Sequence, residues 1–204
     1  NITTAEFFTT EPGEHKSEKN LPIMFPLFVK PITGGDSRGI DKNSIVNNYT
    51  SYKKKVLEIK KNQRSRCLVE KYLSGKEYSV GIFKDIITGL IEAMPIEIIA
   101  KKNENGHHIL DFDIKKNDEE DVIAVLDVKI FNKLTVLAKK SFVALNGKSF
   151  GRIDFKMDNL GNPHFIEANL MPGIRKGYFY RSCLLNLNIN YKEMILKITA
   201  NGLH

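Results

Sequence analysis

The sequence of residues 150–171, FGRIDFKMDNLGNPHFIEANLM, contains two alternating segments separated by a turn. In residues 150–157, charged side chains alternate with apolar ones, which is the period of a strand buried on one face. Residues 164–171 alternate Glu167 and Asn169 with apolar side chains. The residues between them, 158–163, are rich in Asp, Asn, Gly and Pro, so the whole stretch predicts a β-hairpin.

The register of this hairpin decides which side chains face each other. With the turn centred between positions 160 and 161, Asp154 lies across from Glu167, and Arg152 lies across from Asn169. One face then gathers two carboxylates, an amide and a guanidinium. The opposite face is expected to point toward a core, and it carries Ile153, Phe155, Ile166 and Ala168.

The polar face of the predicted hairpin has the composition of a metal and anion site. Two carboxylates that oppose each other across strands repel and require a counter-charge. Asp, Glu and Asn oxygens are ligands that Mg²⁺ takes when it shares its coordination shell with phosphate, and Arg152 is suited to bidentate contact with an anion. The residues alone leave one alternative open, an ordinary solvent-facing side of an antiparallel sheet.

The segment before the hairpin predicts two lobes. In the first, residues 1–24 show no sustained period, 25–30 read as a buried strand that ends at Pro31, and 68–73 read as another strand. Between these two strands, apolar residues at helical spacing predict a helix. Its lysines are expected to turn mostly away from the apolar stripe; they are Lys53, Lys54, Lys55, Lys60 and Lys61. Because residues 74–76 are predicted to form a turn, we place the lobes at 1–74 and 75–204.

The second lobe is expected to contain more strands than helices. Residues 78–83 and 86–99 predict strands, 101–121 a charged surface loop, and 128–145 a helix that ends at Asn146 and Gly147. The hairpin follows, and the chain closes with an amphipathic helix near Tyr191, capped by Asn190. The predicted class is α+β.

Composition narrows the classes of function. The chain has 204 residues and a net charge of +7, and its first 75 residues hold 13 Lys and Arg against 8 Asp and Glu. This excess indicates an anionic ligand, either nucleotide phosphate or nucleic acid. No run of about 18 apolar residues predicts a membrane span. Two cysteines, Cys67 and Cys183, build neither a disulfide framework nor a zinc site, which favours a reducing, cytoplasmic location.

A glycine-rich loop, residues 33–39, follows the strand that ends at Pro31. Its three glycines allow sharp turns and close approach to a ligand. Beside Lys30, its backbone N–H groups and the Ser37 hydroxyl form a candidate phosphate cradle. A plain surface turn is the alternative, and Glu70 and Glu77 by themselves are compatible with ordinary surface carboxylates.

Four segments in this order resemble the ATP-grasp enzymes and, within that superfamily, the D-alanine–D-alanine ligases. They are residues 28–31 with the glycine-rich loop, and residues 68–77, 151–155 and 165–173. The resemblance runs from about Thr3 to the C-terminus. It implies a two-lobed ATP-grasp fold in which each lobe is an antiparallel sheet packed with helices. It also implies an N-terminal substrate domain before Asn1 and a homodimer formed through that domain.

The resemblance implies a role for each candidate residue. ATP phosphates would be contacted by Lys30 and Lys115 and covered by Ser37. The adenine would meet Glu70 and the backbone of Lys71 and Leu73, and the ribose would meet Glu77. The implied cofactors are ATP and two Mg²⁺ ions, with Mn²⁺ as a substitute, and the implied metal ligands are Asp154, Glu167 and Asn169. The candidate catalytic residues are Arg152, which would stabilise the tetrahedral intermediate, Lys115 and Ser37.

The implied reaction activates a carboxylate as an acyl phosphate, which an amine then attacks with release of ADP and phosphate. The implied partners are small carboxylate and amine substrates such as amino acids or dipeptides, in peptidoglycan synthesis, with no nucleic acid and no membrane. The chain departs from the ligase pattern at Asp36, at Lys116 and at residues 174–178. There, Arg175 and Lys176 suit a more anionic acceptor than D-alanine.

Three alternatives to this function stay open at the level of sequence. One is an ATP-grasp ligase for other amino acids or peptides. Another is a non-catalytic ATP-binding module. A nucleic-acid binder is the third, but its basic tract near residues 53–66 is typical of a solvated helix face, and its tyrosines fall on the apolar stripe.

Overall fold

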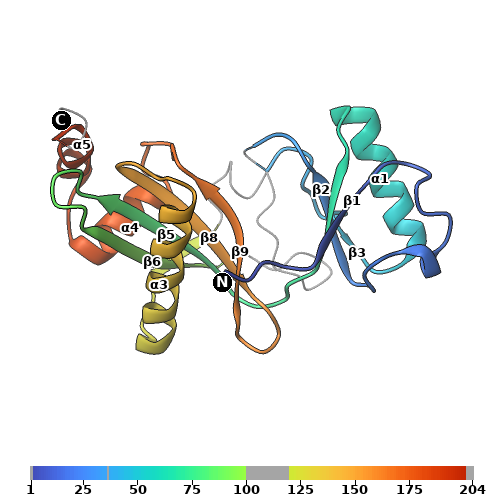
Figure 1. Ribbon diagram of the computed structural model, residues 1–204, viewed down its shortest axis with the longest axis horizontal. Coiled ribbons are helices and arrows are strands. Elements are labelled where there is room, and N and C mark those ends of the chain that lie inside the picture. Colours follow the sequence, from blue (N-terminus) through green and yellow to red (C-terminus); the bar gives the residue numbers. More distant parts are fainter. Residues whose placement is uncertain (1, 36, 100–119, 201–204) are drawn as a thin grey trace. The chain divides into compact units, whose positions relative to one another are not determined.

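The computed structural model describes residues 2–35, 37–99 and 120–200, which form two compact units. One unit contains residues 5–74, and the chain passes into the other at Gly75. Residues 2–4 group with the second unit, because the Phe165 N–H donates to the Thr3 carbonyl at 2.8 Å. Figure 1 shows both units along the chain.

The first unit is a four-stranded antiparallel sheet covered on one face by a helix (Figure 1). The strand order is β1-β4-β2-β3, with β1 at Phe7–Thr10, β2 at Leu27–Pro31, β3 at Ile45–Val46 and β4 at Cys67–Lys71. The helix α1 spans Tyr49–Gln63, and a 3₁₀ turn, η1, spans Glu18–Asn20. The sequence had not predicted β1 or β3.

The helix α1 presents its apolar stripe to the sheet. Tyr52, Val56 and Ile59 are buried against Leu27, Val29, Cys67 and Val69. The helix lysines mostly turn away, as predicted, and the exception is Lys55, which is only 1% exposed. The reason is helical geometry, since Lys55 stands three residues after Tyr52 and four before Ile59, on the buried stripe.

The second unit is a five-stranded antiparallel sheet in the order β7-β6-β5-β8-β9. Its strands are β5 at Glu77–Lys84, β6 at Ile91–Ile99, β7 at Asp121–Ala124, β8 at Phe150–Met157 and β9 at Pro163–Asn169. Its helices are α3 at Val128–Ala144, α4 at Tyr178–Leu187 and α5 at Tyr191–Ala200. No helix in the described ranges combines the length and the apolar character needed to cross a membrane.

Alternate residues of β5 serve two cores on opposite faces of this sheet. Tyr78, Val80 and Ile82 pack with α3, whereas Phe83 packs with α4 and α5. Gly81 lies on the α4 face, and a Cβ there would stand 2.8 Å from the Ser182 Cβ of α4. The α4 face is therefore tightly packed at this end of β5, and it carries the polar side chains described below.

Several predicted boundaries in the second unit need correction. The strand predicted over 86–99 begins only at Ile91, because the Asp85 carboxylate accepts the Ile87 and Thr88 N–H groups and closes a turn. The helix α4 was not predicted. Within the predicted loop 101–121, residues 101–119 lie outside the described residues, and Asp121 already begins β7.

The Asn190 cap of α5 is confirmed, since Asn190 and Glu193 exchange side-chain-to-backbone hydrogen bonds.

Candidate functional site

The predicted register of the β8–β9 hairpin is confirmed at its polar end. Asp154 pairs with Glu167, and Arg152 pairs with Asn169. The register shifts by one residue between Asp154 and Phe155, where β9 contains a bulge. Beyond the bulge, Phe155 faces Phe165.

The bulge changes which apolar side chain of β9 enters the core. Phe165 packs against the α3 core, with its ring centroid 6.4 Å from that of Phe155. The prediction had placed Ile166 on that face. An extra residue in one strand reverses the inward–outward alternation beyond it, so Phe165 replaces Ile166.

Adjacent strands continue the polar rows of the hairpin. On β5, Ser79 pairs with Asp154, Gly81 pairs with Arg152, and Glu77 pairs with Lys156. Because side chains two residues apart share a face, these residues together form one polar face of the second unit. Its members are Glu77, Ser79, Arg152, Asp154, Lys156, Glu167 and Asn169.

Arg152 is the central cation of this polar face. Its Nη2 lies 2.9 Å from Asp154 Oδ2 and 3.4 Å from Glu167 Oε1. Its Nε donates to Asp154 Oδ1 at 3.0 Å, which makes the contact with Asp154 bidentate. The guanidinium carbon lies 5.4 Å from the ring centroid of Tyr178, at the start of α4. Arg152 therefore supplies the counter-charge that the facing carboxylates require.

Burial and charge act on Arg152 in opposite directions. Burial of the guanidinium lowers its pKa, but the charge and hydrogen bonds of Asp154, together with the charges of Glu167 and Tyr178, raise the pKa above its ordinary value. Arg152 is thus a permanent cation with 15% of its side chain exposed. The Ser79 hydroxyl also holds Asp154 in place, because it donates to Asp154 Oδ1 at 2.6 Å.

The donor set of the polar face fits a hard divalent cation. Asp154, Glu167 and Asn169 offer carboxylate and amide oxygens in neighbouring rows, and 56% of the Glu167 side chain is exposed. Asn169 Oδ1 accepts the Met171 N–H at 3.1 Å, which fixes the orientation of the amide. Among the described residues, no cluster of three or more His, Cys, Asp or Glu side chains is placed for a metal, so an ion here would need Asn169 as a ligand.

Glu77, the predicted ribose ligand, forms an ion pair within the polar face. Its Oε2 lies 2.9 Å from the Lys156 Nζ on β8. The side chains are 22% and 14% exposed, so the pair lies at the margin of the face and is partly hydrated. Lys156 was not assigned a role from the sequence, although its two-residue spacing from Asp154 indicated the same face.

In the first unit, the structure brings Lys30 and Glu70 together. The Lys30 Nζ lies 2.6 Å from Glu70 Oε2, on the face of the sheet opposite α1. Glu70 stands in one row with Phe7 of β1 and Phe28 of β2. A carboxylate between two phenylalanines, next to a lysine, suits a flat polar ring, since each Phe offers an apolar surface for stacking.

Phe7 was not among the predicted site residues, because the strand that carries it was not predicted. The alternation of the segment FFTT at residues 7–10 is too short to be distinguished from a loop. Phe7 is 58% exposed, whereas its neighbour Phe8 packs against the α1 core. The large exposed fraction indicates a surface that is available to a ligand.

Lys71 and Leu73 lie next to Glu70 along the chain. The Lys71 N–H donates to the Glu6 carbonyl at 2.8 Å, and its Nζ donates to the Met24 carbonyl at 3.0 Å. The side chain of Lys71 therefore holds the segment that precedes β2. Leu73 is buried at 8% exposure.

Ser37 lies in the glycine-rich loop with its backbone in the left-handed region, at a φ of 58°. Its carbonyl accepts the Ile40 N–H at 3.0 Å, and the Arg38 N–H donates to the Gly35 carbonyl at 3.2 Å. The loop thus forms a tight turn around Ser37. The other predicted phosphate ligand, Lys115, lies outside the described residues, as do Asp36 and Lys116.

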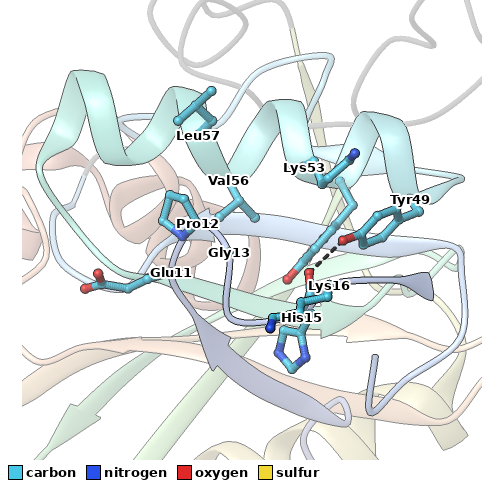
Figure 2. Close-up of a pocket in the computed structure, with 10 residues that line it drawn as sticks. Glu11, Pro12, Gly13, His15, Lys16, Tyr49, Lys53, Val56 and Leu57 are labelled. Carbon is cyan, nitrogen blue, oxygen red and sulfur yellow. Dashed lines mark hydrogen bonds between the residues drawn. The ribbon is translucent and has the colours of Figure 1, made fainter. Parts of the chain in front are cut away.

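The first unit also contains a cavity of about 370 Å³ between residues 11–16 and α1. Figure 2 shows Lys53 and Tyr49 of α1 at this cavity, with the Tyr49 hydroxyl donating to the His15 carbonyl at 2.6 Å. Of the candidate residues predicted from the sequence, none that the structure describes lines it. The candidate site is therefore separate from this cavity.

Comparison with known proteins gives a consistent result. The model of the family described as "D-ala D-ala ligase C-terminus" matches residues 2–200. The D-alanine–D-alanine ligase of Aquifex aeolicus is 30% identical over 192 residues, covering 93% of this chain and 60% of that protein. The ligase of Corynebacterium diphtheriae is 27% identical, over 94% of this chain and 50% of that protein. The chain thus spans about half to three-fifths of these two relatives.

Solved structures share the fold. The D-alanine–D-alanine ligase of Bacillus anthracis, solved in complex with ATP, superposes with a TM-score of 0.73 at 20% identity, covering 99% of this chain and 61% of that one. The VanG D-Ala:D-Ser ligase of Enterococcus faecalis superposes with a TM-score of 0.77 at 18% identity, covering 98% and 57%. The predicted two-lobed α+β architecture, with an antiparallel sheet in each lobe, is confirmed.

Proposed function

This chain belongs to the D-alanine–D-alanine ligase C-terminus family, and from that premise we propose that it is the ATP-binding portion of an ATP-dependent carboxylate–amine ligase. The polar face of the second unit carries this proposal. There, two opposed carboxylates, an amide and a partly buried arginine lie on the paired strands β8 and β9. A solvent-facing sheet surface would not require a guanidinium held by three hydrogen bonds to one aspartate.

The first unit would bind the nucleotide. Glu70 and the backbone of Lys71 and Leu73 would meet the adenine, and the register places Phe7 and Phe28 beside Glu70 for ring contact. Lys30 would exchange part of its contact with Glu70 for a phosphate oxygen. Ser37 would add its hydroxyl, and Lys115 a second cation. Glu77 would hold the ribose, as the family resemblance implies.

Asp154, Glu167 and Asn169 would hold Mg²⁺ on the polar face. The bound ions would neutralise charge on the phosphates during phosphoryl transfer. Ser79 would keep Asp154 in place through its 2.6 Å hydrogen bond. Arg152, a cation at every working pH, would stabilise the anionic intermediate formed when the amine attacks the acyl phosphate.

The segment that leads into α4 favours an acceptor more anionic than D-alanine. Arg175 and Lys176 are exposed and directly precede Gly177 and Tyr178, and Tyr178 contacts Arg152. Two cations this close along the chain to the polar face would attract a second carboxylate on the acceptor. We therefore propose a ligase for amino acids or short peptides, with the D-alanine dipeptide as one candidate product. The homodimer and the cytoplasmic location stay predictions.

The experiment that tests nucleotide binding is thermal unfolding with and without Mg-ATP. The parent is compared with an Asp154→Asn, Glu167→Gln variant and with Glu92→Gln, which removes an exposed carboxylate paired with Lys197. At 100 times the dissociation constant, a ligand adds about 2.7 kcal/mol, which is a shift of several degrees. We expect this shift in the parent and in Glu92→Gln, and its loss in the double variant.

Three results would oppose the proposal. An equal shift in all three proteins would mean that the polar face does not contribute to Mg-ATP binding. No shift in the parent, together with duplex DNA binding that falls steeply with salt, would favour the nucleic-acid alternative. A shift without ADP release by the full-length protein over a set of amino acid pairs would instead favour the non-catalytic module.

A further inference from the structure

Lys55 is a buried cation that joins α1 to the segment after the glycine-rich loop. Only 1% of its side chain is exposed, although Lys53 and Lys54 face solvent. Its Nζ lies 2.9 Å from Asp41 Oδ2 and 3.0 Å from Glu58 Oε1. Glu58 belongs to the same helix, whereas Asp41 follows the loop by two residues.

Asp41 begins a closed turn, residues 41–44, which is tied to the sheet. The Asp41 N–H donates to Ser44 Oγ at 3.0 Å, and the Ser44 N–H donates to the Asp41 carbonyl at 2.9 Å. Asp41 Oδ1 accepts the Asn43 N–H at 2.7 Å, which leaves Oδ2 for Lys55. The Ser44 carbonyl accepts the Val29 N–H of β2 at 2.8 Å. The turn therefore has one anchor on β2 and another on α1.

The opposite end of the glycine-rich loop has its own anchors. The Ile32 N–H donates to the Arg66 carbonyl at 3.0 Å, and the Thr33 and Ser65 hydroxyl oxygens are 3.0 Å apart. These contacts hold the start of the loop to the segment before β4. The position of Ser37 thus depends on two fixed ends, and Lys55 provides the electrostatic contact at the second.

We propose that Lys55 is a positioning residue that holds the end of the glycine-rich loop through Asp41. A lysine ammonium is almost never buried without a partner, because an unpaired charge in the interior is strongly unfavourable. Among the residues that the structure describes, displacing Asp41 would leave this buried charge paired with Glu58 alone, so the ion pair favours one position of the turn. The expected effect of this ion pair on ATP binding rests on the proposed function, in which the loop covers the phosphates.

The test compares two variants that each remove one carboxylate from the same lysine. Asp41→Asn breaks the contact with the turn, whereas Glu58→Gln breaks only the contact within α1. Amide hydrogen exchange is measured at Ile40 and Ser44, whose N–H partners belong to the loop and the turn. We expect exchange about tenfold faster in Asp41→Asn than in Glu58→Gln, the effect of losing one charge-assisted contact. Asp41→Glu should restore slow exchange, and the Kd for Mg-ATP should rise in parallel with the exchange rate.

Equal exchange rates in the two variants would overturn the proposal, because Lys55 would then serve only the packing of α1. The Arg64 amide, which donates to the Lys60 carbonyl at 3.1 Å, reports the stability of the helix and should change equally in both. Faster loop exchange with an unchanged Kd would overturn the link to nucleotide. If no protein binds Mg-ATP, the proposed function fails, and the exchange rates still decide the role of Lys55.

Discussion

Arg152 shows how a single residue can serve both stability and the proposed chemistry. It lies between Asp154 and Glu167, which would repel each other without it. Tyr178 covers one side of its guanidinium. Because the side chains of Arg152 and Asp154 are both largely buried, replacing Arg152 affects folding as well as function. A loss of activity in an Arg152 variant is therefore informative only when its stability is known.

At the residue scale, Arg152→Met is expected to destabilise the second unit. It removes the ion-pair partner of Asp154, whose side chain is only 11% exposed, and removing one partner of a buried pair costs about 3 kcal/mol. Denaturant unfolding followed by circular dichroism measures this loss. Lys129→Met, which removes an exposed lysine of α3, is the control and should stay within about 0.5 kcal/mol of the parent. An unfolding midpoint for Arg152→Met equal to that of the control would contradict the argument.

At the scale of the element, the β8–β9 turn is organised by one carboxylate. Asp158 Oδ1 accepts the N–H groups of Leu160 and Asn162 at 2.9 and 2.8 Å. Its Oδ2 accepts from Asn162 Nδ2 at 3.1 Å and lies 3.3 Å from His164 Nε2. These contacts set where the hairpin reverses, and therefore which residues of β9 face Arg152 and Asp154.

The same turn should make stability depend on pH in the acid range. The hydrogen bond from the Asn162 backbone, followed by other contacts, lowers the pKa of Asp158 from 3.8 to about 2. A depressed pKa in the folded state means that the carboxylate stabilises the fold above its unfolded pKa, and that this contribution is lost as the pH falls from 3.8 toward 2. Asp158→Asn should show a shallower loss of stability over this range in denaturant unfolding at several pH values.

An NMR titration of the Asp158 carboxyl gives an independent check of that prediction. A midpoint near the ordinary value of 3.8 would show that the turn contacts do not hold the charged form.

At the scale of the whole molecule, each unit has its own hydrophobic core. The first core lies between α1 and the four-stranded sheet, and the second and third lie on the two faces of the five-stranded sheet. The residues of each core come from one unit only. A packing defect in one unit is therefore expected to act mainly within that unit.

Ile59→Ala and Leu134→Ala test this independence. Ile59 of α1 is 1% exposed and Leu134 of α3 is fully buried, so each truncation should cost about 2–5 kcal/mol in its own unit. Native-state hydrogen exchange should lose protection mainly in β2 and β4 for Ile59→Ala, and mainly in β5 and β8 for Leu134→Ala. If either variant lowered protection equally in both units, the two units would have to unfold together.

The sequence by itself determined the features that follow local periodicity. Two-residue alternation predicted the hairpin and the facing pairs Asp154–Glu167 and Arg152–Asn169, and helical spacing predicted the stripe of α1. Asn190 was sufficient to predict the start of α5. These features depend on neighbours within a few residues, or on a turn whose length fixes the register. They can therefore be predicted from the sequence.

Only the tertiary structure decided which partner each polar side chain takes. Ser79 reaches Asp154 across 75 positions of sequence, and Tyr178 contacts Arg152 from a helix that was not predicted. The bulge placed Phe165 in the core instead of Ile166, and Lys55 pairs with Asp41, a carboxylate outside its helix. The physical reason is that periodicity tells which face of an element a residue occupies, whereas packing between distant segments decides what that face meets.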